Sequence, residues 1–136
     1  MTTIYAQEPS LSVADYVAVL AETTMRDKRP LANAARIGEM LAGANLIVTA
    51  RRDGDILGLA RCISDGAWIC YCAELAVKES AQGLGIGRGI VEHCYDILGH
   101  RIGLILAAEP EAEGFYARIG MEKVRAAFFH TRADRS

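Results

Sequence analysis

The glycine-dense segment 82–87, Gln-Gly-Leu-Gly-Ile-Gly, is the part of this 136-residue chain whose residue types best suit chemistry. It follows an apolar stretch that ends at Val77 and precedes an amphipathic one. Glycines allow close backbone approach and left-handed turns, and the first N–H groups of a helix are unpaired and carry the positive end of its dipole. We therefore expect a phosphate-binding helix start here. The alternative is a plain turn between a strand and a helix.

Two common phosphate-binding patterns fail on these residues. The dinucleotide pattern G-x-G-x-x-G would need glycine at Arg88 or at Ile90, and the nucleotide P-loop would need a Lys-Ser or Lys-Thr pair after the glycines. The remaining pattern, Gln82-x-x-Gly85-x-Gly87, resembles the signature of the GCN5-related N-acetyltransferase (GNAT) family. The loop of that family wraps the pyrophosphate of acetyl-coenzyme A (acetyl-CoA). The upstream segment Leu75-Ala-Val77 is also similar to the family pattern.

The resemblance implies a complete coenzyme site. Backbone groups of residues 75–77 would pair with the pantetheine arm as an added strand does, and one of their N–H groups would polarise the thioester carbonyl. No metal is expected, because the cysteines and histidines have no zinc-binding spacing. The implied acetyl-CoA-binding residues are Leu75, Ala76, Val77, Gln82, Gly83, Leu84, Gly85, Ile86, Gly87 and Arg88.

A second resemblance concerns Tyr116. The segment 115–121, Phe-Tyr-Ala-Arg-Ile-Gly-Met, is similar to the family segment Phe-Tyr-x-x-x-Gly-Phe. It implies that Tyr116 protonates the departing thiolate, and a phenol and a thiol have similar proton affinities. Many relatives carry asparagine after the preceding strand, where this chain has Ala108-Glu-Pro110. The alternative is that Tyr116 only packs against the sheet.

Glu74 is the candidate general base, because related sequences often show an acidic residue here. Strict alternation along a strand places it on the same face as Cys70 and Cys72. Apolar surroundings would raise the pKa of its carboxyl group, which suits a base. The alternative is a hydrogen-bonded carboxylate that orders a strand bulge near the coenzyme.

Periodicity, a helix cap at Ser12 and a hairpin turn at Asp53-Gly54 predict the elements that position these groups. Their order matches the GNAT fold, an α/β fold with a central mixed sheet, as one domain over residues 1–136. The resemblance implies that parallel strands 68–77 and 104–108 splay apart to admit acyl-CoA. The expected elements are strand 2–5, helix 13–20, helix 31–44, strands 46–51, 56–63 and 68–77, a helix starting near residue 87, strand 104–108, helix 111–119 and strand 124–131.

Composition indicates a small enzyme domain. Half of the chain is hydrophobic, which favours a packed core over disorder. A net charge of −2 argues against nucleic acid as a partner, and no membrane partner is expected because the apolar runs are short. A cytoplasmic location is expected, since the start lacks the pattern of a signal peptide. The cysteines are expected to be free core thiols, and Trp68, Tyr71, Phe128 and Phe129 to pack in the core or line a substrate cavity.

The sequence therefore indicates an N-acetyltransferase that transfers the acetyl group of acetyl-CoA to a primary amine of a small molecule by direct attack. The alternatives are a non-catalytic acyl-CoA-sensing module and a protein (lysine or N-terminal) acetyltransferase. Segments 57–61 and 82–87 are similar to plant-type arylalkylamine (serotonin) acetyltransferases and to many bacterial family members. A homodimer through an exposed last strand is possible.

Overall fold

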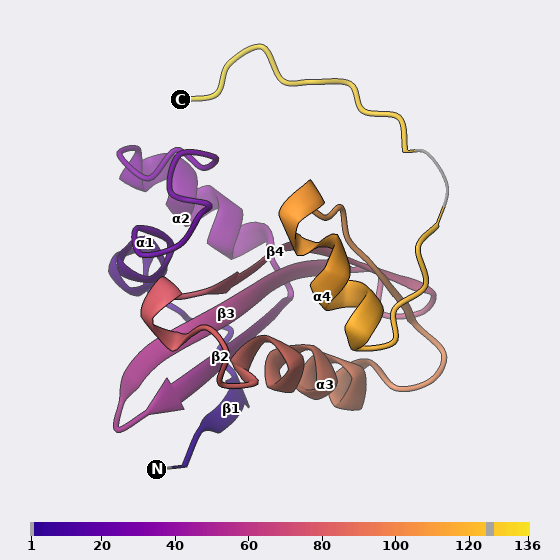
Figure 1. Cartoon of the computed structure of the whole chain (residues 1–136). Helices are drawn as coiled ribbons and strands as arrows, with labels where there is room; N and C mark the ends of the chain where they lie inside the picture. The colour runs from indigo at the N-terminus through magenta and orange to yellow at the C-terminus, as the bar shows by residue number, and fades with distance from the viewer. Residues whose placement is uncertain (1, 125–126) are drawn as a thin grey trace.

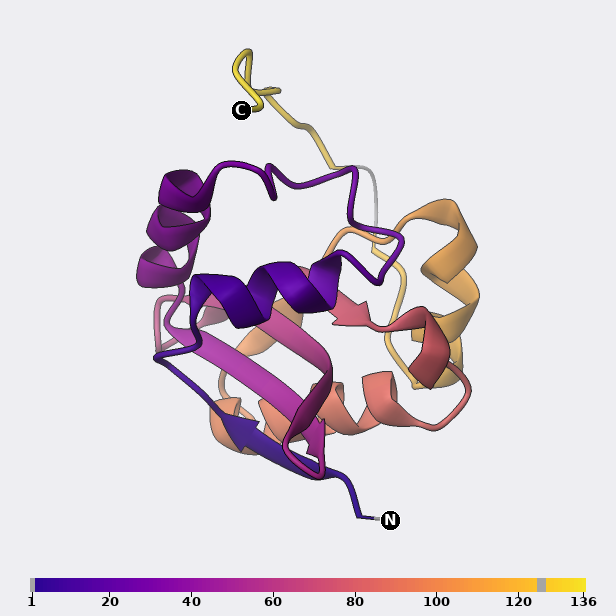
Figure 2. The same ribbon diagram turned by 90° about the vertical axis from the view of Figure 1, so that its left-hand side faces the viewer.

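The computed structural model describes residues 2–124 and 127–136. A five-stranded sheet with the order β1-β2-β3-β4-β5 has helices on both faces (Figures 1 and 2). Neighbouring strands are antiparallel except β4 and β5, which are parallel. In the described residues, no helix combines the length and apolar character needed to cross a membrane. The elements are β1 (Ile4–Gln7), α1 (Val13–Leu20), α2 (Ala34–Gly43), β2 (Leu46–Arg52), β3 (Asp55–Ser64), β4 (Ile69–Val77), η1 (Glu79–Ala81), α3 (Ile86–Leu98), β5 (Gly103–Ile105), η2 (Pro110–Ala112) and α4 (Glu113–Arg118).

The core has two layers, one on each face of the sheet. Helices α1 and α2 pack on one face, and α3 packs on the other (Figure 1). The expected cap of α1 is confirmed, because Ser12 Oγ accepts a hydrogen bond from the backbone N–H of Asp15 at 3.1 Å. All four cysteines are buried and free, and they lie in the layer beneath α3, so the expectation of core thiols is confirmed.

A β-bulge in β4 decides which side chains face which layer. Cys72 and Glu74 lie opposite consecutive residues of β3, so Ala73 is an extra residue in β4. One extra residue reverses the faces of all side chains that follow. Cys70 and Cys72 therefore pack under α3, whereas Glu74 contacts Tyr16 of α1 on the opposite face. The expectation that Glu74 shares a face with Cys70 and Cys72 is wrong, because strict alternation does not foresee the bulge.

The sheet ends earlier than the sequence indicates. Strand β5 covers residues 103–105 in place of 104–108, and the chain then leaves the sheet. The last expected strand, 124–131, is also wrong where it can be judged, because Val124 and residues 127–131 form no strand. Residues 125 and 126 of that prediction lie outside the described residues. The order of the preceding elements agrees with the prediction.

The aromatic residues expected in the core are on the surface. Trp68 is 77% exposed and Phe128 is 98% exposed, and Tyr71 and Phe129 are also exposed. The expectation of core packing is therefore wrong, and none of the four residues lines either of the two cavities described below. Trp68 lies in the turn before β4, and the two phenylalanines lie in the segment after α4, which runs outside the body of the protein (Figure 1).

Candidate active site

A cavity of about 620 Å³ lies where β4, the glycine loop and α4 meet. The end of β4 and the start of α3 form its floor, and the loop between α1 and α2 contributes Thr23, Thr24 and Met25. It brings together residues of three segments that are far apart in the sequence. Its lining includes Leu75, Ala76, Val77, Gln82, Gly83, Gly85, Ile86, Gly87 and Tyr116, all of them predicted site residues. Leu84 and Arg88 were also predicted, but they lie outside this lining.

The glycine loop has the backbone geometry of an anion site. Gly83 and Gly85 have φ angles of +78° and +77°, which side chains with a Cβ rarely adopt. Among the described atoms, none lies within 4 Å of where a Cβ would stand at either residue. The first hydrogen bond of α3 runs from Gly89 N–H to the Gly85 carbonyl at 3.0 Å, so the N–H groups of residues 86–88 precede it. This cradle fits pyrophosphate oxygens.

Gln82, Gly87 and Arg88 of the glycine segment make contacts within the protein. Gln82 donates a hydrogen bond from Nε2 to the carbonyl of Val77 at 3.1 Å, which ties the loop to the end of β4. A Cβ at Gly87 would come within 3.0 Å of the Phe115 ring, so this glycine lets α4 pack on the start of α3. The guanidinium of Arg88 binds Glu92 one turn later in α3.

Strands β4 and β5 separate beside this loop. Their pairing covers only Ile69–Tyr71 and Gly103–Ile105, and β4 continues to Val77. The bulge at Ala73 lies two residues after the last pair, and a bulge bends and twists its strand. The edge of residues 75–77 that faces the cavity is therefore not covered by β5. The pairing of the two parallel strands thus stops before the glycine loop, which is consistent with the expected splay.

Tyr116 contributes a phenol to the same cavity. It lies in α4, and its ring meets that of Phe115 edge to face with centroids 5.1 Å apart. Burial, with a smaller contribution from the charge of Cys72, raises the pKa of Tyr116 to about 12. The phenol is therefore protonated at neutral pH and can donate a proton.

Glu74, the predicted base, does not line the cavity that contains Tyr116. Its side chain has no exposed surface, and it accepts two hydrogen bonds from Arg61, at 2.5 and 2.9 Å. Arg29 donates a further hydrogen bond at 3.1 Å, and the hydroxyl of Tyr16 donates one at 2.5 Å. Arg29 also donates to the carbonyl of Ala73, the bulge residue, at 2.8 Å. The network therefore connects the bulge to α1 and to the loop after α1.

The pKa of the Glu74 carboxyl group is shifted in the direction opposite to the one expected from the sequence. Burial is the largest single influence and would raise the pKa of the carboxyl group. The hydrogen bonds and charge of Arg61, the charge of Arg29 and the hydrogen bond from Tyr16 together outweigh it, so the pKa is lowered. The expected raised pKa is wrong. A carboxylate held this firmly in its charged form is a weak base, and its partners fit the alternative of a group that orders the bulge.

Sequence reasoning missed the residues that surround Glu74. Arg29 lies in the charged segment 26–29 between two expected helices, and Arg61 lies in the middle of an apolar strand. A buried strand arginine is itself a signal, because such a charge needs a carboxylate partner. Two further ion pairs, Arg26–Glu79 at 3.0 Å and Lys28–Glu109 at 3.2 Å, hold the loop over the site.

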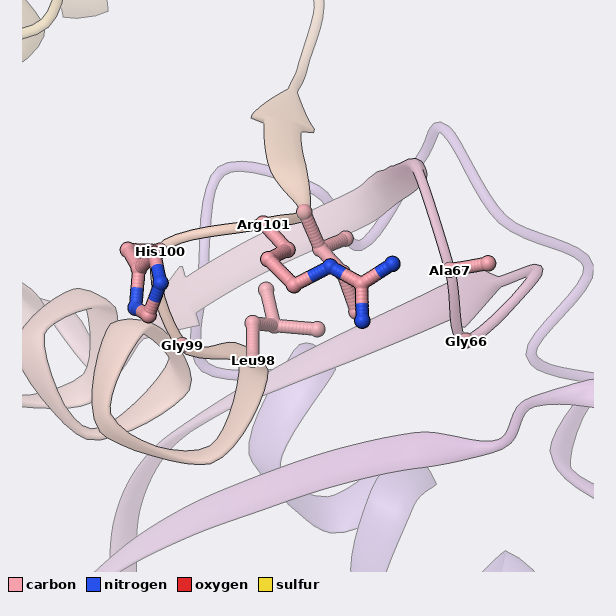
Figure 3. Close-up of a pocket in the computed structure, with 7 residues that line it drawn as sticks. Gly66, Ala67, Leu98, Gly99, His100 and Arg101 are labelled. Atoms are coloured by element: carbon pink, nitrogen blue, oxygen red, sulfur yellow. The ribbon is translucent and has the colours of Figure 1, made fainter.

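A second hollow, of about 250 Å³, lies at the other end of α3. Figure 3 shows Leu98, His100 and Arg101 beside the turn at Gly66 and Ala67. Because α3 has 13 residues, about 20 Å separates the two ends of the helix. The second hollow contains none of the predicted site residues. In the described residues, no three His, Cys, Asp or Glu side chains form a group that could hold a metal ion.

Known proteins are similar to this chain in sequence or in fold. Serotonin N-acetyltransferase 2, chloroplastic, of Oryza sativa subsp. japonica is 36% identical over 69 residues, which are 49% of this chain and 34% of the rice protein. The present chain thus matches about a third of the length of that curated relative.

Solved structures share the fold at low identity. A GNAT-family acetyltransferase of Streptococcus pneumoniae TIGR4 superposes with a TM-score of 0.73 at 17% identity, covering 96% of this chain and 99% of its own. An acetyltransferase of Trypanosoma brucei gives 0.66 at 20% identity, covering 98% and 99%. An aminoglycoside acetyltransferase from an uncultured soil metagenomic sample gives 0.67 at 18% identity, covering 98% and 100%.

The family model described as "Acetyltransferase (GNAT) domain" matches residues 14–131, which include the glycine loop, β4 and α4. This match spans most of the sequence, and it covers each of the segments that line the large cavity. The chain belongs to the GNAT acetyltransferase family.

Proposed function

We propose that this protein is an acetyl-CoA-dependent N-acetyltransferase that acts on a primary amine of a small molecule. The observation that carries the proposal is the content of one cavity: a glycine cradle at a helix start, an uncovered strand edge and a protonated phenol. Each corresponds to a different part of an acyl-CoA molecule: the pyrophosphate, the amide-bearing arm and the sulfur. The cytoplasmic location expected from the sequence belongs to the same proposal.

The residues present fit acetyl-CoA. We assign the pyrophosphate to the backbone N–H groups at residues 83–88, because the space beside Gly83 and Gly85 is open. We assign the pantetheine arm to the backbone of residues 75–77, which line the cavity beyond the end of β5. Bound acetyl-CoA supplies a thioester whose acetyl group passes to the amine nitrogen.

We assign to Tyr116 the proton that the sulfur receives when the carbon–sulfur bond breaks. The position of its phenol in the cavity supports this role, and the group carries its proton at neutral pH. The proton that the amine loses on forming the carbon–nitrogen bond goes to water, since the lowered pKa of Glu74 makes that carboxylate a poor acceptor. We assign Glu74 to positioning: it holds the bulge that turns β4 away from β5.

The names of the relatives suggest the class of acceptor. The lining of the cavity is mixed in charge, because Glu79 is paired with Arg26 and Arg118 lies in the same lining as Glu111. The rice relative is named for serotonin, an arylalkylamine, and one structural relative for aminoglycosides. Arylalkylamines are therefore the first acceptors to test and aminoglycosides the second.

A titration of the protein with acetyl-CoA tests the binding half of the proposal. We expect wild type to bind and Gly85→Asp to lose binding, because a carboxylate beside the pyrophosphate costs several kcal/mol, or about a hundredfold or more in affinity. The matched control is Gly66→Asp, which has a similar positive φ of +74° and open surroundings but lies in the β3–β4 turn. Equal loss in both variants would contradict the loop assignment.

Release of free thiol in the presence of an amine panel tests the catalytic half. Binding of acetyl-CoA with no thiol release for any small amine would favour the sensing module. Thiol release only with lysine peptides or protein amino termini would favour the protein acetyltransferase.

A further inference from the structure

Four free thiols lie in one buried layer beneath α3. Cys62 of β3, Cys70 and Cys72 of β4 and Cys94 of α3 belong to the same cluster, and none of these residues is more than 5% exposed. They are all the cysteines of the chain, and the proposed acetyl transfer uses none of them. A cluster of thiols on three elements allows thiol chemistry inside the fold.

Cys62 and Cys72 are the two cysteines whose positions suit a disulfide. They are directly opposite one another in the antiparallel register of β3 and β4, and both pack beneath α3. Residues in this relation have Cα atoms about 4.5–5.5 Å apart, and a disulfide spans roughly 4.4–6.8 Å between Cα atoms. Cys70 lies opposite Ser64, so the register gives it no cysteine partner across the strands.

The two thiols differ in how readily they lose a proton. Hydrogen bonds with Cys72, and then with Cys94, lower the pKa of the Cys62 thiol against the opposing effect of burial. The hydrogen bond with Cys62, together with burial, raises the pKa of the Cys72 thiol. Because the thiolate is the form that attacks an oxidant, Cys62 is the thiol that reacts first.

The least well packed part of the protein covers one side of this layer. None of the described residues after Cys94 is buried. Elements with few buried contacts open locally at a low cost in free energy, and hydrogen peroxide is scarcely larger than water. A local opening of this part therefore gives peroxide access to the thiols. Partly buried side chains that pack against the cluster from this part are Leu98, Ile102, Leu104 and Leu106.

We propose that Cys62 and Cys72 form a peroxide-sensitive pair, whose reversible conversion to a disulfide weakens the acetyl-CoA site. The sulfur of Cys62 attacks one oxygen of hydrogen peroxide, the oxygen–oxygen bond breaks, and a sulfenic acid forms with release of one water. The sulfur of Cys72 then attacks the sulfur of Cys62, the sulfur–oxygen bond breaks, and a second water leaves. Two thiols are oxidised to one disulfide, and one peroxide is reduced to two waters.

The disulfide forms beside the bulge of β4. Sγ of Cys72 donates a hydrogen bond at 3.3 Å to the carbonyl of Glu74, across the bulge residue Ala73. Oxidation removes the S–H group that makes this bond and ties the start of the bulge covalently to β3. Residues 75–77 follow the bulge, so we expect their edge of the cavity to shift and the affinity for acetyl-CoA to fall. This consequence rests on the proposed function.

Thiol counting and peptide mapping test the disulfide without acetyl-CoA. Reduced wild type is treated with equimolar hydrogen peroxide, denatured and titrated for thiols. We expect loss of two of the four thiols and their recovery with dithiothreitol. Chymotrypsin cleaves after Trp68 and Tyr71 and so separates the three strand cysteines. The linked peptides should contain Cys62 and Cys72.

Alanine variants of the four cysteines provide matched controls. Cys62→Ala and Cys72→Ala should lose no pair of thiols under the same treatment. Cys70→Ala and Cys94→Ala, in the same buried layer, should still lose two. The proposal is overturned by linked peptides that contain Cys70 or Cys94, by thiols that dithiothreitol does not restore, or by a wild type that keeps all its thiols.

Titration of reduced and oxidised protein with acetyl-CoA tests the consequence. We expect binding about tenfold weaker for oxidised wild type, since a hydrogen bond at the bulge is lost, and full recovery after reduction. Cys62→Ala keeps the S–H group of Cys72 and has no partner for it, so peroxide should leave its affinity unchanged. Equal affinity of oxidised and reduced wild type overturns the switch. No binding by either form contradicts the proposed function instead, and the peptide map still decides whether the disulfide forms.

Discussion

The part of the protein from β1 to α3 and the part that follows α3 differ in how they are held together. From β1 to α3 the chain has helices packed on both faces and a buried ion-pair network around Glu74. From the end of α3 onward, the described residues include a three-residue strand, a short helix and no buried side chain. The coenzyme loop belongs to the first region, and the proposed acid, Tyr116, belongs to the second. Substitutions in the first region should therefore cost stability, and those in the second should cost turnover.

The largest expected effect is on Glu74. Glu74→Gln leaves the guanidinium groups of Arg61 and Arg29 without their full charge partner, and breaking a buried pair costs about 3–5 kcal/mol of unfolding free energy. Denaturant unfolding measures this loss. The control Glu92→Gln breaks an exposed pair with Arg88 and should cost less than about 1 kcal/mol.

The same variant separates positioning from base catalysis. If Glu74 were the general base, raising the pH would partly restore turnover in Glu74→Gln, because free amine becomes available without it. We expect a pH–rate profile of unchanged shape together with weaker acetyl-CoA binding or a lower melting temperature. Recovery of turnover at high pH, in a variant as stable as wild type, would return the role of base to Glu74.

Leucine truncation on each side compares the two regions directly. Leu59→Ala removes a fully buried side chain of β3 and should cost about 2–5 kcal/mol. Leu104→Ala removes a partly buried side chain of β5 and should cost about 1 kcal/mol of unfolding free energy. If the two variants lost the same unfolding free energy, the region around β5 would be as well packed as the rest.

Tyr116→Phe should lower turnover and leave stability unchanged. The ring remains and the hydroxyl is lost, so stability and acetyl-CoA affinity should stay near wild type. Turnover should fall about a hundredfold for a lost general acid, which corresponds to about 2.7 kcal/mol in activation free energy. Steady-state and single-turnover kinetics measure this change. An unchanged chemical step would assign Tyr116 to packing alone.

The smallest effect is the response to acid. The folded state lowers the pKa of Glu74 below its ordinary value of 4.5, so its network stabilises the fold above that pH. The stabilisation is lost as the pH falls below 4.5 and through the folded pKa. The difference in unfolding free energy between wild type and Glu74→Gln should therefore narrow in acid. A difference that stays constant down to pH 3 would contradict the lowered pKa.

Local signals predicted most of the fold and the phosphate side of the site. Ser12 as a helix cap, Asp53-Gly54 as a hairpin turn and the glycines at 83 and 85 act through neighbouring residues, so their effects can be judged from a short stretch. The correct element order from β1 to α4 follows from the same local patterns. The face of Glu74 could not be predicted in this way, because one bulge residue reverses it and the bulge depends on Arg29, 44 positions away from Ala73.

The family, the order of elements and the loop that suits a pyrophosphate were predictable from the sequence, because each depends on contiguous residues. That Glu74 is a buried ion-pair partner depends on the fold, since the groups that lower its pKa come from α1, β3 and the loop after α1. The fold also exposes Phe128 and Phe129 to solvent and leaves β5 paired with β4 alone among the described strands. Burial and strand pairing are properties of segments brought together in space, and alternation along one strand does not contain them.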